Sequence, residues 1–484
     1  MNMLNNADLT TEFDEYISLD AIELANLVKI NKLSQLDLVE IVIRRIEAIN
    51  PKLNFMANTT FDRARERTTS ISNSSKFSGL PILVKDMIDI GGVKRTDGSR
   101  LMSTNIPKEN VDFIEALEAS GANILGTTNV PEFACTLTTH NDLYGETINP
   151  WNSQYTAFGS SGGSAVAVAC GAVPMAHGSD GAGSNRLPAS ANGVIGMKPS
   201  RYRMLAGEID SGHDIAKTNQ MISRTVRDSA AMLDATEDKS GEYYPPIGMV
   251  TGSSERRLTI GVIKDFTGLL DVEPAVHASL LSTIKLLKSL GHTVVEKSNP
   301  IDATQLTNAY LGFFSSKSSM LKPTIEQITG KTPAESGLVT KLLASLLDYN
   351  EQFTEQDAKD GVDYFNTLPD LFDELFVDCD IVLTPVSPII SPLVGKLSPD
   401  FNVDADLLDY TCGLLKFTLP INFAGNPAMS LPLFWDDETG MPIGNQFIAK
   451  SGDDKTIYEL AYELEIAKPW KDKWPSVSLK TWQQ

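Results

Sequence analysis

Hydrophobic positions along the chain alternate between a helical and a strand-like spacing. Over residues 18–49, apolar side chains recur every three or four positions, which predicts two surface helices, the second ending at Pro51. Short apolar runs at residues 79–84 and 123–126 predict strands, and the periodic segment 112–120 between them predicts a helix. This succession of strand, helix and strand is typical of a largely parallel sheet in an α/β protein.

The same succession returns in the second half of the chain. Strands are predicted at residues 258–263, 292–296, 380–383, 428–433 and 443–449, and a helix at residues 274–290. Residues 236–257 are polar and rich in turn-forming residues, so they are the best place for an internal boundary. Residues 303–368 have a mostly helical pattern without a recognisable motif. The length of 484 residues leaves the number of domains open, because one large α/β domain or two or three average ones would fit.

The composition is that of a globular protein, with 42% apolar and 21% charged residues. The formal net charge of -21 repels phosphate backbones, so nucleic acid is not an expected partner. The four cysteines include no C-x-x-C pair, which argues against a disulfide framework and a zinc site. No Lys or Arg precedes Lys29, and the longest apolar run, residues 165–176, is too short to span a bilayer. We therefore expect a cytoplasmic protein without a membrane or nucleic-acid partner.

The candidate chemistry lies in two loops of small residues between positions 158 and 188. The first contains G-x-S-x-G, which would make Ser161 the nucleophile of a histidine-dependent hydrolase. No clear strand leads into this loop, however, and no histidine stands in a recognisable site. The second loop fails the dinucleotide-binding pattern because Arg186 occupies its last glycine position. What both loops offer is serine hydroxyls and consecutive backbone N–H groups, the components of an oxyanion hole.

Lys85 is the candidate base, because it follows the predicted strand at residues 79–84. Sites in open α/β sheets gather at the carboxyl ends of strands. Full burial lowers the pKa of a lysine by up to about 3–5 units, which would allow it to accept a proton. Position alone favours an ordinary surface charge, so the pattern by itself leaves both interpretations open.

Taken together, the motifs of this chain resemble the amidase signature family. The four main matches are LPILVKD (80–86), GSSGGS (159–164), GSDGAGSNRLP (178–188) and GVIGMKP (193–199). Further matches are GTTNVPEF (126–133), NPWN (149–152), RTVRD (224–228), LTP (383–385), FTLP (417–420) and GMPIG (440–444). The resemblance covers nearly the whole chain, weakens between about residues 303 and 368, and is nearest to the 6-aminohexanoate cyclic dimer hydrolases within the family.

The resemblance implies a Ser-cisSer-Lys triad at the matching positions. Ser184 is expected to be the nucleophile, Ser160 the bridging serine and Lys85 the base, with a cis peptide bond between Gly159 and Ser160. The expected oxyanion hole consists of the backbone N–H groups of Gly181, Ala182, Gly183 and Ser184.

Four neighbouring residues complete the expected nucleophile loop. Asp180 and Arg186 are expected to fix this loop by hydrogen bonds without taking part in the chemistry. Ala182 and Asn185 depart from the family's usual residues, and Ala182 would strain the loop if its position required a positive φ. Neither departure touches a triad residue, so an active enzyme is still expected.

The same resemblance implies one amidase signature domain over residues 1–484, an α/β fold whose mixed, mostly parallel sheet is covered by helices on both faces. Its catalytic core would span about residues 76–235, and a variable, mostly helical region on the substrate side about residues 303–368. The expected activity is hydrolysis of amide bonds in small or linear carboxamides through an acyl-enzyme, without a cofactor or a metal.

Three other functions stay open at this point. They are a component of a glutamine-dependent tRNA amidotransferase that resembles its A subunit, a cyclic or linear oligoamide hydrolase, and a binding protein without catalysis. The expected partner is a small-molecule amide, and the resemblance allows a homodimer.

Overall fold

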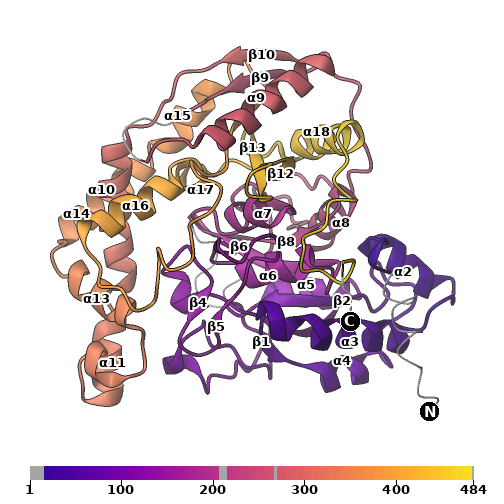
Figure 1. Cartoon of the computed structure of the whole chain (residues 1–484), viewed down its shortest axis with the longest axis horizontal. Helices are drawn as coiled ribbons and strands as arrows, with labels where there is room; N and C mark the ends of the chain where they lie inside the picture. Colours follow the sequence, from indigo (N-terminus) through magenta and orange to yellow (C-terminus); the bar gives the residue numbers. More distant parts are fainter. Residues whose placement is uncertain (1–15, 207–214, 266–269, 482–484) are drawn as a thin grey trace.

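The computed structural model describes residues 16–206, 215–265 and 270–481, and an eleven-stranded sheet runs through its centre (Figure 1). The strand order is β1-β3-β2-β6-β8-β7-β12-β13-β11-β9-β10. The strands are β1 Met56–Thr59, β2 Pro81–Lys85, β3 Asn123–Thr128, β6 Met175–Asp180, β7 Ile195–Lys198, β8 Thr218–Ser223, β9 Thr259–Val262, β10 Thr293–Glu296, β11 Ile381–Pro385, β12 Ala428–Trp435 and β13 Pro442–Ala449. β4 His140–Asn141 and β5 Gly145–Glu146 form a separate small hairpin.

Parallel pairing occurs in two blocks of this sheet. β2 is parallel to both β3 and β6, and β9 is parallel to both β10 and β11. The strands between the two blocks pair antiparallel, with β8 inserted between β6 and β7. Strands from before and after residues 236–257 therefore share one sheet, and the expected α/β domain with a mixed sheet is confirmed.

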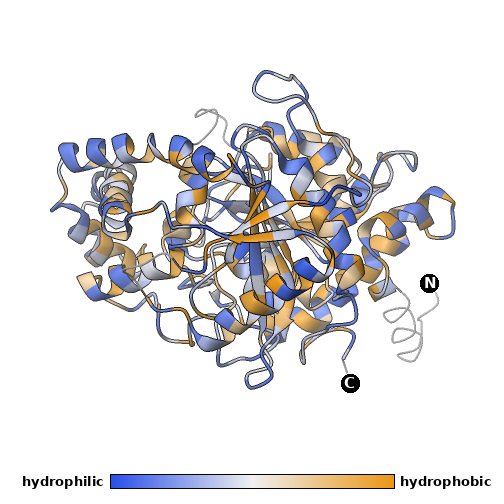
Figure 2. Ribbon diagram, turned by 90° about the horizontal axis from the view of Figure 1, so that it is seen from above, coloured by the Kyte–Doolittle hydropathy of each residue, from blue (hydrophilic) through white to orange (hydrophobic). Residues whose placement is uncertain are grey.

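Helices cover both faces of the sheet. They are α2 Ala21–Lys29, α3 Gln35–Leu53, α4 Phe61–Arg67, α5 Asp112–Ala119, α6 Gly162–Ala169, α7 Arg186–Asn192, α8 Val226–Thr236, α9 Pro274–Ser289, α10 Ala303–Ser318, α11 Leu321–Thr329, α12 Pro333–Ser336, α13 Lys341–Asn350, α14 Glu355–Phe365, α15 Leu368–Leu375, α16 Ala405–Leu415, α17 Leu419–Ala424 and α18 Asp454–Ala467. Hydrophobic residues concentrate on the strands and on the helix faces turned toward them (Figure 2). In the described part of the chain, no helix is long and apolar enough to cross a membrane.

The expected end of α3 at Pro51 was wrong by two residues. Pro51 lies inside the last turn of α3, which continues to Leu53 and ends where Asn54 adopts a left-handed conformation with φ 53°. Pro51 lacks the N–H that would donate to the carbonyl four residues back, so the last turn of the helix loses one hydrogen bond and the helix ends two residues later.

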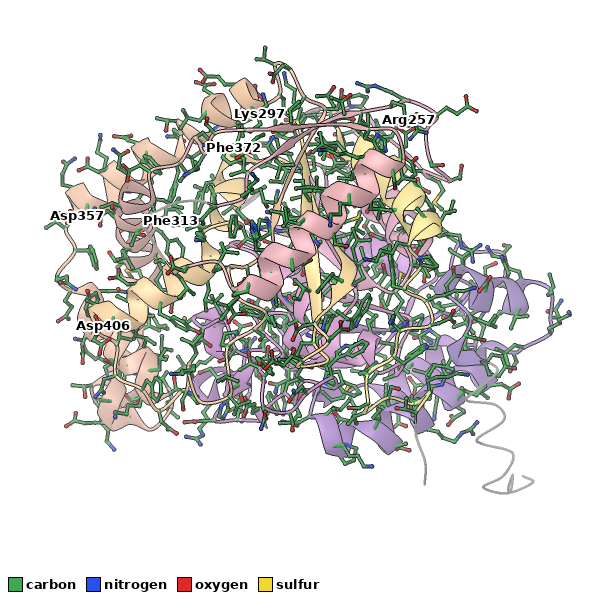
Figure 3. The ribbon with its side chains drawn as sticks, turned by 45° about the horizontal axis from the view of Figure 1, so that its top comes forward. Arg257, Lys297, Phe313, Asp357, Phe372 and Asp406 are labelled. Carbon is green, nitrogen blue, oxygen red and sulfur yellow. The ribbon has the colours of Figure 1, made fainter. Side chains whose placement is uncertain are left out.

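The helices from α10 to α14, together with α16, form an arm beside the sheet (Figure 1). Aromatic packing joins this arm to α17: the rings of Phe365 and Phe423 are stacked with centroids 3.6 Å apart, and Phe313 meets both rings edge-on. Figure 3 shows Phe313 among the arm helices, whereas the exposed Asp357 and Asp406 lie at the outer edge. The arm is therefore anchored to the sheet domain by its own apolar core.

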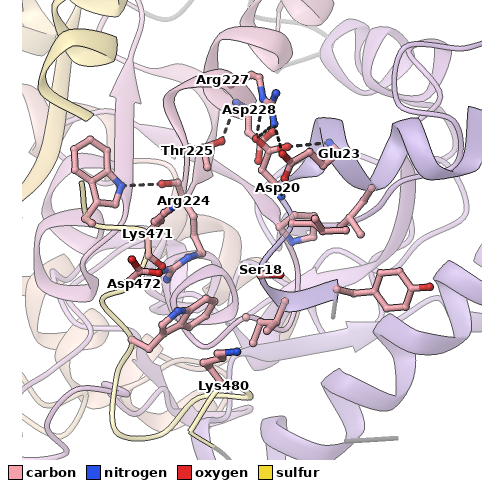
Figure 4. A pocket seen from close by; sticks show the side chains of 18 of the residues that line it. Ser18, Asp20, Glu23, Arg224, Thr225, Arg227, Asp228, Lys471, Asp472 and Lys480 are labelled. Carbon is pink, nitrogen blue, oxygen red and sulfur yellow. Dashed lines mark hydrogen bonds and ion pairs between the residues drawn. The ribbon is translucent and has the colours of Figure 1, made fainter. Parts of the chain in front are cut away.

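Hydrogen bonds hold the helix α2 against α8. Asp228, buried in α8, accepts hydrogen bonds from the N–H groups of Ala21 at 2.9 Å and Ile22 at 3.2 Å. Arg227 reaches back to Asp20, the N-cap of α2, at 2.8 Å. Asp20, Arg227 and Asp228 line one side of a cavity of about 680 Å³ between α2, α8, α18 and the C-terminal segment (Figure 4). Asp228 thus supplies the acceptors that the first turn of α2 needs.

We expect Asp228→Ala to lower the free energy of unfolding by about 1–3 kcal/mol, because two buried N–H groups lose their acceptor. The two N–H groups donate to different carboxylate oxygens, so Asp228→Asn keeps one acceptor and should be destabilised less than Asp228→Ala. Chemical denaturation with urea measures both variants. A loss below about 0.5 kcal/mol in Asp228→Ala would contradict the role of Asp228 as the acceptor for the first turn of α2.

The pH dependence of stability provides a separate test of the same residue. Burial, reinforced by the charge of Asp20, raises the pKa of the Asp228 carboxyl well above its usual range. The folded protein therefore keeps a proton that the unfolded chain releases above about pH 4. The free energy of unfolding of the wild type should fall as the pH rises from about 4 through the raised pKa. This component of the slope should disappear in Asp228→Asn, and an unchanged slope would contradict the assignment.

Candidate active site

The site begins at Lys85, the last residue of β2, which is the third strand from one edge of the sheet. All five residues of β2 are buried, and Lys85 itself is only 1% exposed. Its Nζ lies 2.7 Å from Ser160 Oγ, 3.0 Å from Ser179 Oγ and 3.3 Å from the Ser179 carbonyl oxygen. Lys85 is therefore not a surface charge: its amine points into a pocket of serine oxygens at the carboxyl end of a strand, where α/β proteins place their sites.

The surroundings of Lys85 favour its neutral form. Burial lowers the pKa of its amine well below the usual range, and the nearby charge of Lys217 lowers it further, while Asp180 and Asp97 act in the opposite direction. A lysine with a strongly depressed pKa can accept a proton at neutral pH. Lys85 thus has both the position and the electrostatic environment of a general base.

Ser160 lies directly after a cis peptide bond, and this bond joins Gly159 to Ser160 as the motif implied. The next residue ties the two loops together, because the N–H of Ser161 donates to the carbonyl of Ser184 at 3.2 Å. Ser184 itself is half-buried in the loop between β6 and α7. A direct hydrogen bond thus joins Lys85 to Ser160. The next residue, Ser161, holds the backbone of Ser184.

Ser161, the residue that a literal match to G-x-S-x-G selects, is fully buried. Its hydroxyl is 3.3 Å from the carbonyl of Ser179 and 3.2 Å from Asn185 Oδ1. As expected, no strand leads directly into Gly159. Ser161 therefore serves to hold the two loops together and is not presented to a substrate.

A buried ion pair holds the nucleophile loop. Arg186 donates to the Asp180 carboxylate through Nε and a terminal nitrogen, both at 2.9 Å, and neither side chain is exposed. The same carboxylate accepts the N–H of Gly183 at 2.7 Å and the side-chain amide of Asn422 at 2.9 Å. Burial alone would raise the pKa of Asp180, but the Arg186 guanidinium outweighs it and holds the pKa below its usual range. The hydrogen bonds by which Asp180 and Arg186 were expected to fix this loop are present.

The two unusual residues of this loop fit without strain. Gly183, and not Ala182, takes the positive φ of 122°, and a Cβ on Gly183 would approach Thr418 Oγ1 to 2.4 Å. The carbonyl of Ala182 accepts a hydrogen bond from the Thr418 hydroxyl at 2.7 Å. Asn185 is fully buried, and its amide donates to the carbonyl of Met197 at 3.3 Å. The strain considered for Ala182 therefore does not arise.

Three side chains join the site that sequence motifs did not assign to it: Ser179, Thr418 and Lys217. Ser179 contacts the Lys85 amine directly, and Thr418 comes from the start of α17, more than two hundred residues after the loop it supports. Lys217 lies beside Gly181. Within the described ranges, no group of three His, Cys, Asp or Glu side chains is arranged as metal ligands.

The buried pair of Lys85 and Ser160 thus lies within an α/β fold. The Amidase family model matches residues 37–458, and the chain therefore belongs to the amidase family, whose members hydrolyse amides.

Individual relatives agree with this membership over nearly the full length of the chain. A protein of Mycobacterium leprae named as an amidase, AmiC, is 33% identical over 93% of this chain and 96% of its own length. The A subunit of the glutamyl-tRNA(Gln) amidotransferase of Lactiplantibacillus plantarum is 30% identical, covering 92% and 96%. Among solved structures, 6-aminohexanoate cyclic dimer hydrolase complexed with substrate superposes with a TM-score of 0.86 at 28% identity, covering 96% and 99%. The chain is an amide hydrolase with the fold expected for this family.

Proposed function

We propose that this protein hydrolyses the amide bonds of small or linear carboxamides through a triad of Ser184, Ser160 and Lys85 and an acyl-enzyme intermediate. The observation that carries the proposal is the 2.7 Å contact between the buried Lys85 Nζ and Ser160 Oγ, in surroundings that favour the neutral amine.

The first half-reaction forms the acyl-enzyme. Neutral Lys85 accepts the hydroxyl proton of Ser160, which in turn accepts the proton of Ser184 as the Ser184 oxygen attacks the amide carbonyl carbon. The tetrahedral intermediate then collapses, the carbon–nitrogen bond breaks, and the relay returns the proton to the departing amine. In the second half-reaction, the relay takes a proton from water, and the hydroxide oxygen attacks the acyl-enzyme. The carboxylic acid leaves and Ser184 regains its proton.

The backbone N–H groups of Gly181, Ala182 and Ser184 would bind the oxyanion, whereas the N–H of Gly183, expected to join them, instead donates to the Asp180 carboxylate. The ion pair of Asp180 and Arg186 supports this role, because it fixes the loop from inside the protein before a substrate arrives. Removing one such donor from a hydrolase typically costs about 10²–10³ in kcat. Preorganisation of this loop is therefore expected to matter as much as the base.

The substrate is the open part of the proposal. We place the catalytic core at about residues 76–235 and assign acyl and amine selection to the arm around residues 303–368. Two of the alternatives have relatives that favour them, namely the tRNA amidotransferase component and the cyclic dimer hydrolase. A hydrolase should turn over simple amides as a single chain, whereas one isolated component of an amidotransferase should not do so robustly.

A panel of amides tests the proposal with the purified chain. We expect release of ammonia or amine from at least one of the short aliphatic amides, aryl amides, and linear or cyclic ω-amino acid oligomers. Turnover confined to the cyclic and linear oligomers would favour the oligoamide hydrolase, and no turnover of any panel member would contradict the proposal. Ser184→Ala protein provides the blank for each substrate.

A further inference from the structure

Ser179 supplies two of the three oxygen atoms that surround the Lys85 amine in the described part of the chain. Its hydroxyl oxygen lies 3.0 Å from Lys85 Nζ and its carbonyl oxygen 3.3 Å, and Ser160 Oγ, at 2.7 Å, is the third. All three residues are buried. Ser179 lies outside the proposed triad, yet it touches the proposed base with both its side chain and its backbone.

Strand pairing and a neighbouring serine fix the position of Ser179. It lies in β6, between β2, which carries Lys85, and β8, where it pairs with Asn219. The Ser179 N–H donates to Ser161 Oγ at 3.4 Å, and the Ser161 hydroxyl donates back to the Ser179 carbonyl at 3.3 Å. The oxygens of Ser179 are therefore held in place before a substrate arrives.

The neutral form of the Lys85 amine has two N–H groups and one lone pair to share among these three oxygens. The Ser179 carbonyl can only accept, so it takes one N–H, whereas each serine hydroxyl can either donate or accept. In the proposed relay, Ser160 donates its proton to the lone pair. The second N–H is then left for the Ser179 hydroxyl oxygen, and the two oxygens of Ser179 together turn the lone pair toward Ser160.

The same three oxygens serve the ammonium group that forms when Lys85 has taken the Ser160 proton. Its three N–H groups then donate to Ser160 Oγ and to both oxygens of Ser179, so the amine does not have to rotate. A hydrogen bond from a charged donor is roughly twice as strong as one between neutral groups. The contact between Lys85 and the Ser179 hydroxyl therefore strengthens as the proton arrives, which favours the transfer.

We propose that Ser179 is a positioning residue of this hydrolase, whose two oxygens engage both N–H groups of the neutral Lys85 amine and so direct its lone pair to the Ser160 proton. The inference rests on the proposed triad, because Ser179 acts only through Lys85 as the base. In this role Ser179 keeps its own proton and does not bind the substrate.

The loss of the Ser179 hydroxyl should have a specific pH signature. Because this hydroxyl stabilises the ammonium more than the neutral amine, Ser179→Ala should lower the pKa of Lys85 by about one unit. Where Lys85 is neutral in the free enzyme, kcat/KM should fall about tenfold for the same reason. Below the acid limb, Lys85 is an ammonium in the free enzyme as well as in the transition state. The bond is then lost equally from both, and the rate of the variant should approach that of the wild type.

The other titratable and charged groups around Lys85 are the same in every variant. Burial lowers the pKa of Lys85, Lys217 lowers it further, and Asp180 and Asp97 raise it. His177, two residues before Ser179 in β6, is buried, and burial lowers its pKa to about 3, so it stays neutral near pH 7. These groups set where the acid limb lies, whereas the difference between the variants reports on Ser179.

The kcat/KM profile is measured from acid to alkaline pH on an uncharged aryl amide. Ser179→Thr keeps the hydroxyl and should retain the wild-type profile. Ser179→Val has nearly the shape of Ser179→Thr without the hydroxyl, so it should show the same change as Ser179→Ala. Ser229→Ala removes a buried hydroxyl that contacts Tyr458 at 2.9 Å and should leave the profile unchanged. A loss in Ser179→Ala and Ser179→Val that is equal at every pH would overturn the inference, and so would a wild-type profile in both.

A second measurement does not depend on activity. Protein labelled with carbon-13 at the lysine ε position is titrated by NMR, and the Lys85 signal is assigned by its absence in Lys85→Met. The midpoint of Lys85 should be about one pH unit lower in Ser179→Ala and Ser179→Val than in the wild type or Ser179→Thr. An unchanged or higher midpoint overturns the inference. If the midpoint falls but Lys85→Met retains full activity, the contact of Ser179 with Lys85 stands and the proposed triad is the part that fails.

Discussion

Replacing Ser184 with alanine should abolish amide hydrolysis. Without the Ser184 oxygen no acyl-enzyme can form, and only the oxyanion loop and substrate binding remain to assist direct attack by water. In serine hydrolases, removal of the nucleophile lowers kcat by about 10⁶, and we expect a loss of at least about 10⁴ here. Steady-state amine release on the best substrate of the panel, with enzyme at high concentration, measures the residual rate.

The fold should survive this substitution, because Ser184 is half-buried and its described link to Ser161 runs through the backbone carbonyl. Unchanged circular dichroism and thermal unfolding would confirm this. A serine-directed acylating probe gives the complementary result: it should label Ser184 in the wild type and nothing in Ser184→Ala. Labelling of Ser161, or more than a few per cent of wild-type turnover in the variant, would refute the assignment of the nucleophile.

Local sequence was sufficient for the parts of the fold that depend on neighbouring residues. The helix at residues 112–120 and the strand at residues 123–126 appear as α5 and β3. The spacing of their apolar residues and the glycine between them determine these two elements without distant contacts. The position of Lys85 at a strand end also followed from the apolar run before it. What the pattern could not decide was whether that lysine is solvated, since burial depends on loops far away in the chain.

Long-range pairing explains most of what the sequence did not predict. β8 lies between β6 and β7 although it follows both in the chain, so no local pattern places Lys217 opposite Gly181. Likewise, Asn422 and Thr418 reach the nucleophile loop from α17 and the residue before it. Ser179 could have been noticed, because in a strand it alternates with Asp180 and faces the Lys85 side. Register and strand order are tertiary properties, and they complete the site.

Lys85→Met should be the next most damaging substitution, lowering kcat by about 10²–10⁴, the usual contribution of a general base. Methionine keeps most of the length of the side chain but cannot accept a proton, so Ser160 loses its partner at 2.7 Å. The same loss is expected for Lys85→Arg, because a guanidinium stays protonated at any usable pH. The wild type should gain activity with rising pH as Lys85 loses its proton, and because burial lowers the pKa of Lys85, this rise should end well below the range of a free lysine.

Two results distinguish a catalytic defect from a folding defect in Lys85→Met. In the unfolded wild type Lys85 carries a proton that the folded protein gives up, which costs stability at neutral pH; methionine avoids this cost, so the variant should be at least as stable as the wild type. Ser160→Ala should also lower kcat, and the double variant should be scarcely slower than either single one, because the two groups act as one relay. Losses that multiply in the double variant would mean that Lys85 and Ser160 act independently. The proposed relay connects Lys85 to Ser184 only through the hydrogen bond between Lys85 and Ser160. Independent effects of the two substitutions would therefore contradict the proposed triad.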